Sequence, residues 1–324
     1  MSKIRIKHFG PIKEGLVNNQ GGWMDIKKVS IFIGNQGAGK STIAKVFSTF
    51  SWIEKALVRG DYSENSIKLR NSIKTKFLSY HRLENYFHKG KTIIEYQGDA
   101  YYLSYKNGSF EIKKNLENTS YELPQIMYVP AERNFITYVK TPTELRLSSP
   151  SLAEFLVEFN NSKIDLEKDE KMPINDTTIE YDRLNDRLNL TGTDYKLHIS
   201  ESSSGFQSSV PLYLVSKHLA KSVKNQSKQN GNLMSGKEKE RFRKEIEEIL
   251  NNNELTEEQR RIAISVLTSK YNKSAFINIV EEPEQNLFPD SQQKMLYKLL
   301  EFNNMCVGNK LLITSHSPYM INYL

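Results

Sequence analysis

A glycine-rich segment has the residue types and spacing of a phosphate-binding loop. Its sequence, Gly34-Asn35-Gln36-Gly37-Ala38-Gly39-Lys40-Ser41, fits the pattern G-x-x-x-x-G-K-[ST]. Glycines let the backbone curl, so that successive N–H groups converge on phosphate oxygens at the start of a helix. Lys40 places a positive charge near the outer phosphates, and the Ser41 hydroxyl is suited to Mg²⁺. We therefore predict that this loop, with the adjacent Thr42, binds a nucleotide; a chance match, on the order of 1% for a chain of this length, is the alternative.

Two adjacent carboxylates follow an apolar run near the C-terminus. Glu281 and Glu282 come directly after residues 276–280, which read as a buried strand. Ligands in α/β sheets bind at the carboxyl ends of strands. Successive strand side chains point to opposite faces, so the two glutamates should have different roles. One can hold magnesium through its water shell and the other can polarise an attacking water. The simpler alternative is a charged loop after a core strand.

Two more polar clusters stand at the ends of predicted elements. The serine-rich segment 202–208 enters a helix, either as an N-cap with free donors or as a second anion site, because hydroxyls and a helix N-terminus both favour phosphate. His316 follows the apolar run 310–314. A lone histidine in such a place is more often structural than catalytic, and both interpretations stay open on this pattern alone.

The elements that must position these residues alternate between strands and helices. Residues 29–33 form a β-branched apolar run before the loop, and apolar residues then recur at helical spacing from Ser41 to Leu57. Strand, glycine loop and helix make one half of a doubly wound α/β unit. Other predicted strands cover 4–9, 92–96, 101–105, 109–113, 125–129, 188–190, 195–199, 275–280 and 310–314, with Asn107-Gly108 as a hairpin turn. Other predicted helices contain 152–159, 242–250, 262–267 and 291–302. Thr256 and Gln259 form a capping pair before the third of these, whose predicted apolar face is Ile262, Ala263, Val266 and Leu267. We expect residues 161–177 to form an exposed loop and residues 225–236 to be flexible.

Composition narrows the class of protein. The chain has 324 residues, 38% of them hydrophobic, which is enough for a sizeable core. A single cysteine, Cys306, excludes an intrachain disulfide, and no stretch reaches the roughly 18 apolar residues of a membrane span. We therefore expect a cytoplasmic protein with no membrane partner. The net charge of +7 permits a nucleic-acid partner without requiring one.

In this order, the motifs resemble those of an ABC-class ATPase head of the SMC/RecF type, and most closely those of bacterial AAA-family ATP-binding proteins related to the OLD (overcoming lysogenization defect) family. Residues 34–41 match the Walker A loop and Ser204-Gly205-Phe206-Gln207 matches the signature motif. Residues 280–283 with 284–289 match Walker B and the D-loop region, and His316 matches the switch histidine. Residues 128–133 resemble a stretch near the Q-loop of these proteins.

The resemblance implies a fold, ligands and residue roles. The fold is α/β, a P-loop NTPase of ABC-head type with a mixed sheet flanked by helices and helical insertions. Lys40 and Ser41 would bind the β- and γ-phosphates of ATP and its Mg²⁺. Glu281 would be the Walker B carboxylate that holds the metal, Glu282 the catalytic glutamate and His316 the γ-phosphate sensor. Ser204 and Gly205 would complete the site of a second subunit, so that ATP joins a homodimer or higher homo-oligomer.

The same resemblance suggests a division of the chain into parts. These are 1–60 with Walker A, 61–200 with β-hairpins and the Q-loop-like region, 201–224 as the signature helix, 225–274 as a helical insertion, and 275–324 with Walker B and the switch histidine. The sequence also departs from the pattern of the family. Glu281 stands where aspartate is usual, Phe206 replaces the second signature glycine, residues 128–134 contain no glutamine, and the chain ends eight residues after His316.

Several function classes can be compared on these motifs. Lys40 and Glu281 stand 241 residues apart, too far for a hexameric AAA+ motor, and a small-molecule kinase would lack the signature and the paired glutamates. A transporter head stays possible, although nothing in the sequence looks like a coupling surface and no stretch is predicted to span a membrane. An ATPase with nucleotide-dependent dimerisation is favoured, acting in DNA repair or anti-phage defence beside a nuclease or toxin partner. A non-catalytic nucleotide-gated scaffold is the competing interpretation.

The prediction that DNA is a direct partner rests on basic residues in two regions of the chain. The first group is Lys68, Arg70, Lys74 and Lys76, and the second lies between 237 and 261, interleaved with glutamates. Interleaved charges of both signs favour a solvated helix face for the second group. The paired helices there could resemble a DNA-reading helix-turn-helix, but an inserted hairpin that docks a partner is the preferred interpretation.

Overall fold

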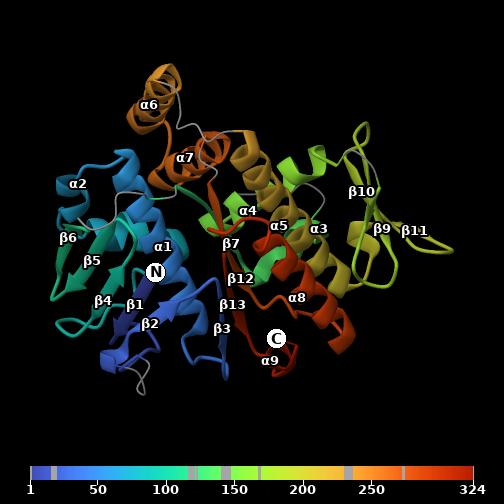
Figure 1. Ribbon diagram of the computed structural model, residues 1–324, viewed down its shortest axis with the longest axis horizontal. Coiled ribbons are helices and arrows are strands. Elements are labelled where there is room, and N and C mark those ends of the chain that lie inside the picture. Colours follow the sequence, from blue (N-terminus) through green and yellow to red (C-terminus); the bar gives the residue numbers. More distant parts are fainter. Residues whose placement is uncertain are drawn as a thin grey trace.

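The site lies on a four-stranded parallel sheet in the middle of the molecule (Figure 1). The computed structural model describes residues 2–15, 20–115, 121, 123–139, 147–166, 169–229, 236–271 and 274–323. The sheet has the order β3 (Val29–Ile33), β13 (Lys310–Ser315), β12 (Ala275–Glu281) and β7 (Pro124–Val129). Because all four strands are parallel, their carboxyl ends meet at one edge. The phosphate loop, His316, the two glutamates and Pro130 each follow one of these strands.

Helices cover both faces of this sheet. Its strands β12 and β7 are buried at every position, so both faces must be covered. Ile277 and Ile279 point to the face covered by α1 (Lys40–Arg59) and join its core. Phe276 and Val280 point to the opposite face, where α5 (Ser204–Gln229) and α8 (Pro289–Asn303) pack. By the same alternation Glu281 shares the α1 face with the two isoleucines. The α/β class with a phosphate loop between strand and helix is confirmed.

An antiparallel sheet lies beside α1, at the left of Figure 1. Its order is β2 (Met24–Ile26), β1 (Ser2–Lys7), β4 (Ile93–Gln97), β5 (Tyr101–Lys106) and β6 (Ser109–Lys114). The predicted Asn107-Gly108 hairpin is confirmed, since both residues take the positive φ values of such a turn.

One buried carboxylate ties this sheet to α1. Glu54 accepts hydrogen bonds from the Tyr96 hydroxyl and from the N–H groups of Ala100 and Tyr101, at 2.7, 2.6 and 3.0 Å. Burial raises the pKa of Glu54, and these three donors oppose the rise. The helix that begins at the phosphate loop is therefore fixed to the neighbouring sheet near its C-terminal end.

A third sheet lies at the right of Figure 1, next to α4 (Pro150–Ile164) and α5. It is antiparallel, in the order β11 (Lys196–His198), β10 (Arg187–Thr191), β9 (Thr178–Asp182) and β8 (Glu170–Lys171). The parallel and antiparallel strands of the chain thus form separate sheets. The remaining elements are α2 (Glu64–Lys68), α3 (Phe135–Tyr138), α6 (Gly236–Asn251), α7 (Glu257–Tyr271), α9 (Tyr319–Asn322), a π-helical turn at Ile73–Leu78 and 3-10 turns at Gln20–Gly22, Ser79–His81, Ala131–Asn134 and Ile199–Glu201.

Three sequence expectations are wrong in part. The expected exposed loop 161–177 begins inside α4 and then buries Met172 and Ile174, which complete the core beside α5. The expected flexible stretch 225–236 begins inside α5, which extends to Gln229, and residues 230–235 lie outside the described residues. The run 29–33 is half-buried rather than buried, because β3 is the edge strand of its sheet.

Helices α6 and α7 lie in the segment 225–274, which the family resemblance suggests is an insertion, and α7 is anchored by a buried arginine. The predicted capping pair at its start is confirmed, with Thr256 and Gln259 exchanging two hydrogen bonds. Among the α7 side chains that the structure describes, the buried ones are Arg261 and Ile264, whereas those at 262, 263, 266 and 267 are half-buried. The Arg261 guanidinium lies 3.7 Å from the centre of the Tyr80 ring and 4.6 Å from that of Trp52, and it donates to the Phe77 carbonyl oxygen at 2.9 Å.

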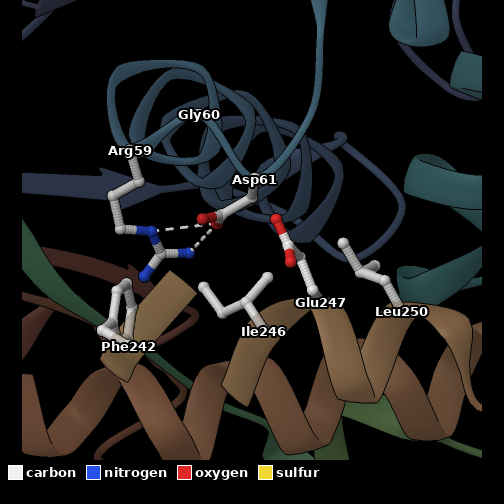
Figure 2. Close-up of a pocket in the computed structure, with 7 residues that line it drawn as sticks. All are labelled: Arg59, Gly60, Asp61, Phe242, Ile246, Glu247 and Leu250. Atoms are coloured by element: carbon white, nitrogen blue, oxygen red, sulfur yellow. Dashed lines mark hydrogen bonds and ion pairs between the residues drawn. The ribbon is translucent and has the colours of Figure 1, made fainter. Parts of the chain in front are cut away.

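Helix α6 packs over the C-terminal end of α1 (Figure 2). Arg59 and Asp61 form a buried ion pair there, and the guanidinium also faces the ring of Phe242. A cavity of about 360 Å³ remains between the two helices, lined by Arg59, Gly60, Asp61, Phe242, Ile246, Glu247 and Leu250. In the described part of the chain, no helix is both long and apolar enough to cross a membrane.

We predict that Arg261→Lys loosens the insertion while Arg260→Lys does not. Lysine keeps the charge of Arg261 but lacks the planar group that contacts two rings and a carbonyl at once, so unfolding free energy should fall by about 1–3 kcal/mol. Arg260 makes its hydrogen bonds at the surface and serves as the matched control. Denaturant unfolding measures stability, and limited proteolysis reports release of α6 and α7. Equal losses in the two variants would contradict the anchoring role.

Candidate functional site

The phosphate loop has the backbone geometry that its glycines allow. Gly37 and Gly39 have φ values of 74° and 93°, in the left-handed region that costs other residues energy. A Cβ atom on Gly39 would lie 2.6 Å from Cγ1 of Ile12, so this position also lacks space for a side chain. Residues 35–38 are exposed, and no side chain caps the start of α1. The first N–H groups of α1 are therefore available donors for an anion.

Three predicted residues meet in one contact chain at the carboxyl edge of the sheet. The Lys40 ammonium donates to the carbonyl oxygens of Gly34 and Asn35 at 2.6 and 2.7 Å, and it lies 3.4 Å from Nδ1 of His316. Nε2 of His316 lies 3.2 Å from a carboxylate oxygen of Glu282. An ammonium can only donate, so this network assigns the acceptor role to Nδ1 and the proton to Nε2. One imidazole thus joins the loop lysine to the second glutamate.

The two adjacent glutamates occupy different environments. Glu281 ends β12 and is 3% exposed; its Oε2 accepts from the Ala131 N–H at 3.3 Å, and its buried Oε1 has no partner among the described residues. Burial, and then the Glu281 charge, raise the pKa of Tyr128 well above its usual value, so that hydroxyl keeps its proton beside the carboxylate. The Glu282 side chain is a third exposed and its backbone has a φ of 45°.

The residues on the α1 face fit a magnesium ion bound together with phosphate. Magnesium prefers oxygen ligands and is usually held by one or two protein groups plus water and phosphate oxygens. The unpartnered Oε1 of Glu281 and the hydroxyl of Ser41 are oxygen ligands of this kind. Within the described residues, no three His, Cys, Asp or Glu side chains gather into a metal cage. The donor set therefore suits a metal that arrives with a nucleotide.

Arg133 is the central residue that the sequence pattern did not single out. It is fully buried after β7 and donates to four backbone carbonyl oxygens: Nε to Ser208 at 3.0 Å, Nη1 to Pro130 at 3.1 Å and Glu281 at 2.6 Å, and Nη2 to Glu282 at 2.6 Å. Burial lowers the pKa of Arg133 to about 10, and the nearby carboxylates, Glu284 first, oppose the fall. The guanidinium therefore stays charged at neutral pH. Backbone partners leave no residue pattern, so only its place in the segment 128–133 could have drawn attention to it.

The predicted signature segment begins α5 and packs against the turn after β12 in the same chain. Ser204 is exposed and Gly205 is buried. A Cβ atom on Gly205 would lie 2.7 Å from the Asn286 carbonyl oxygen, so the close approach of helix and turn requires glycine. Ser208 donates to the side-chain oxygen of Gln285 at 3.1 Å. Within the described residues, Ser204 and Gly205 make no hydrogen bond with residues 34–42.

Helix α5 carries a proline at its eighth residue, and a neighbouring hydroxyl compensates for it in part. Pro211 has no N–H to donate to the Gln207 carbonyl. The single proton of the Thr137 hydroxyl is shared between that carbonyl oxygen, at 3.2 Å, and the Asn134 carbonyl oxygen, at 2.8 Å. The carbonyl oxygen of the next residue, Ser208, accepts from Arg133. The two side chains together fix the first turns of α5 to the segment after β7.

The basic residues proposed for DNA are partly engaged with other groups. Lys68 pairs with Glu64 at 2.9 Å and Lys76 with Glu257 at 3.6 Å. The Lys74 ammonium lies 5.8 Å from the centre of the Phe87 ring. These pairings reduce the net charge presented by the group, and DNA binding through it stays a prediction.

Comparisons with known proteins add little to this geometry. No family model and no curated protein sequence matches the chain. Three solved SMC head domains are similar in structure. An SMC head bound to the C-winged-helix domain of ScpA has 10% identity and a TM-score of 0.38, and the SMC head from Thermotoga maritima has 9% identity and a TM-score of 0.39; each match covers 99% of this chain and 90% of that chain. An SMC head with an extended coiled coil, bound to the C-terminal domain of ScpA derived from Pyrococcus furiosus, has 10% identity and a TM-score of 0.39, and the match covers 100% of this chain and 92% of that chain. The roles of the site residues therefore rest on their own contacts.

We predict that Arg133→Lys destabilises the protein strongly. A lysine ammonium cannot reach four carbonyl oxygens that a planar guanidinium reaches, so two or more buried acceptors lose their donor, at about 1–3 kcal/mol each. The unfolding free energy should fall by at least about 2 kcal/mol, measured by denaturant titration. Arg70→Lys, at an exposed position, is the matched control and should change it by less than about 0.5 kcal/mol. Similar stabilities of the two variants would refute this role of Arg133.

Proposed function

We propose that this protein binds and hydrolyses ATP. The observation that carries the proposal is the contact chain from Lys40 through His316 to Glu282, beside an uncapped helix start. It brings together a cation for phosphate, a ring able to donate or accept a proton, and a partly exposed carboxylate. These are the parts that phosphoryl transfer to water needs, since positioning and electrostatic stabilisation supply most of its catalysis.

Each residue would have a separate task in this reaction. The loop N–H groups, from Gly34 to Thr42, and the Lys40 ammonium would bind the β- and γ-phosphates. Ser41 and Glu281 would hold Mg²⁺, which when bound neutralises phosphate charge. Glu282 would orient and deprotonate the attacking water, and His316 would fix the Glu282 carboxylate through its Nε2 proton. To sense the γ-phosphate, His316 would donate that proton to a phosphate oxygen in place of Glu282, because Nδ1 accepts from Lys40.

A non-catalytic nucleotide-gated scaffold is the competing proposal. Glu281 in place of the usual aspartate and Phe206 in place of a glycine favour it, because both are departures at the expected site. Phe206 lies on α5, is half-buried and packs against the apolar core there, so packing also explains why a phenylalanine stands at this position. Phosphate release by the purified protein, with and without DNA, distinguishes a hydrolase from a scaffold.

Nucleotide-dependent dimerisation is part of the proposal. The exposed Ser204 at the start of α5 is suited to an anion from outside the chain, because a hydroxyl and a helix start both favour phosphate. A second copy would bring its ATP to this segment. A role in DNA repair or anti-phage defence, with a nuclease or toxin partner, rests on the sequence resemblance alone, and an adjacent nuclease or toxin gene would support it.

We predict that Lys40→Ala abolishes tight ATP binding without unfolding the protein. The variant removes charge-assisted hydrogen bonds worth about 1.5–3 kcal/mol, so affinity should fall about tenfold or more in isothermal titration. Lys27→Ala, at an exposed position two residues before β3, is the control and should bind like the parent. Unchanged affinity in Lys40→Ala would exclude the phosphate-loop role.

We also predict opposite effects of Glu282→Gln and Ser204→Arg on assembly. Glu282→Gln keeps the size of the side chain but removes the base, so turnover should fall about 100-fold or more while ATP still binds and the dimer accumulates. Ser204→Arg places bulk at the expected contact and should prevent assembly.

Light scattering with ATP and Mg²⁺, together with crosslinking between the phosphate loop and α5, measures both outcomes. Glu301→Gln, on the exposed side of α8, is the matched control for loss of a carboxylate. If Glu282→Gln ignores nucleotide, or Ser204→Arg assembles like the parent, the two-subunit site is wrong.

A further inference from the structure

One carboxylate oxygen holds the backbone on both sides of His316. Oε1 of Glu284 accepts hydrogen bonds from the Ser315 hydroxyl at 2.8 Å, from the His316 N–H at 2.7 Å and from the Ser317 N–H at 3.2 Å. Two successive N–H groups that converge on one anion form a nest, a geometry that favours negative charge. Here the anion is a side chain of the protein itself.

The loop around His316 has further support from α8. The Ser315 hydroxyl oxygen also accepts from the Ser317 N–H at 2.9 Å. Ser317 in turn donates through its hydroxyl to the side-chain oxygen of Gln292 at 2.7 Å. These bonds orient the loop, and Glu284 is the group that accepts from the N–H groups of both His316 and Ser317.

Glu284 belongs to a turn that is fixed independently of the His316 loop. Within the turn, Gln285 and Leu287 donate their N–H groups to the carbonyl oxygens of Glu282 and Glu284, each at 3.0 Å. Arg133 donates to the Glu282 carbonyl. On the other side, the start of α5 contacts the turn at Gly205. The Glu284 carboxylate therefore extends from a fixed turn to the loop that carries the histidine.

The Glu284 carboxylate lies close to a buried positive charge, that of Arg133. Among the carboxylates that act on Arg133, Glu284 has the largest effect in raising the pKa of that buried guanidinium, so the two opposite charges lie near each other. Hydrogen bonds to an ionised acceptor are roughly twice as strong as neutral ones. A carboxylate in this place holds the loop more firmly than an amide of the same shape.

We propose that Glu284 is the positioning residue that places the His316 ring between Lys40 and Glu282. This inference rests on the proposed function for the importance of that ring, but the placement itself is a property of the protein alone. Loss of the carboxylate leaves the His316 N–H without its acceptor and leaves the Ser317 N–H with its 2.9 Å bond to the Ser315 hydroxyl oxygen alone. The ring then no longer keeps its distances of 3.4 Å to Lys40 and 3.2 Å to Glu282.

Three variants of the full chain test the placement. Glu284→Ala removes all three bonds. Glu284→Gln keeps an acceptor oxygen without the charge, so it tests the placement even if Glu284→Ala does not fold. Gln285→Ala changes the neighbouring residue of the same turn, which bonds to Ser208 and not to the His316 loop, and is the matched control. The readout is the ring signal of His316 in carbon–proton spectra of histidine-labelled protein, assigned among six histidines with His316→Asn.

We expect the His316 signal to move in Glu284→Ala, to move less in Glu284→Gln and to stay in place in Gln285→Ala, with the other five signals unchanged in all three. ATP hydrolysis gives a second readout. Because a misplacement of about 1 Å can cost about 100-fold in rate, kcat should fall by that order in Glu284→Ala with KM changed less than about twofold. Adding Glu284→Ala to His316→Ala should lower kcat no further, since both act through one ring.

The outcomes separate this inference from the proposed function. A His316 signal that stays in place in Glu284→Ala overturns the positioning role, whatever the activity. So does an additive loss of kcat in the double variant. If the parent protein hydrolyses no ATP, the proposed function fails, and the ring signal still decides the role of Glu284.

Discussion

The arrangement of the site depends on the burial of one positive charge, Arg133, at the edge where four parallel strands end. Its four bonds join the segment after β7, the last residue of β12 with the residue that follows it, and the first turns of α5. Each buried carbonyl that lost its donor would cost about 1–3 kcal/mol, so these three pieces of chain are held together as one unit. Removing a guanidinium from water is itself costly, and the lowered pKa of Arg133 expresses that cost. The carboxylates around it offset the cost, which links their positions to its own.

The positions of Glu282 and His316 follow from this unit through a few backbone hydrogen bonds and the order of the strands. Glu282 has a φ of 45°, an unfavourable value for a residue with a side chain, and bonds from both sides keep it there: Arg133 to its carbonyl and its own N–H to the Thr314 carbonyl. Because β13 lies between β3 and β12, the residue after β13 stands between the phosphate loop and the glutamates. His316 occupies that place. Sheet order, rather than sequence distance, therefore brings Lys40 and Glu282 to the two sides of one imidazole.

Much of the fold was predictable because it depends on local patterns. The periodicity of α1, the glycines of the phosphate loop, the Asn107-Gly108 turn and the Thr256–Gln259 cap each act within a few residues, and the structure has all four elements. The errors arose where tertiary contacts override local pattern. Residues 161–177 are polar in composition, yet Met172 and Ile174 complete a core, and α7 buries Arg261 because aromatic rings and a carbonyl receive it.

The residues of the candidate site also fall into those that local pattern predicted and those that it did not. Residues that bind through their own side-chain chemistry, such as Lys40, Glu282 and His316, belong to motifs and were found by spacing. Arg133 and Glu284 act mainly on backbone groups, which every residue offers alike, so their partners leave no pattern in the sequence. Gly205 belongs to both groups. The motif predicts that it lies near phosphate, and the structure shows that the close approach of the Asn286 carbonyl oxygen also requires glycine there. The residues that hold a site in place are thus harder to find from sequence than those that do its chemistry, and here they form a connected layer directly beneath it.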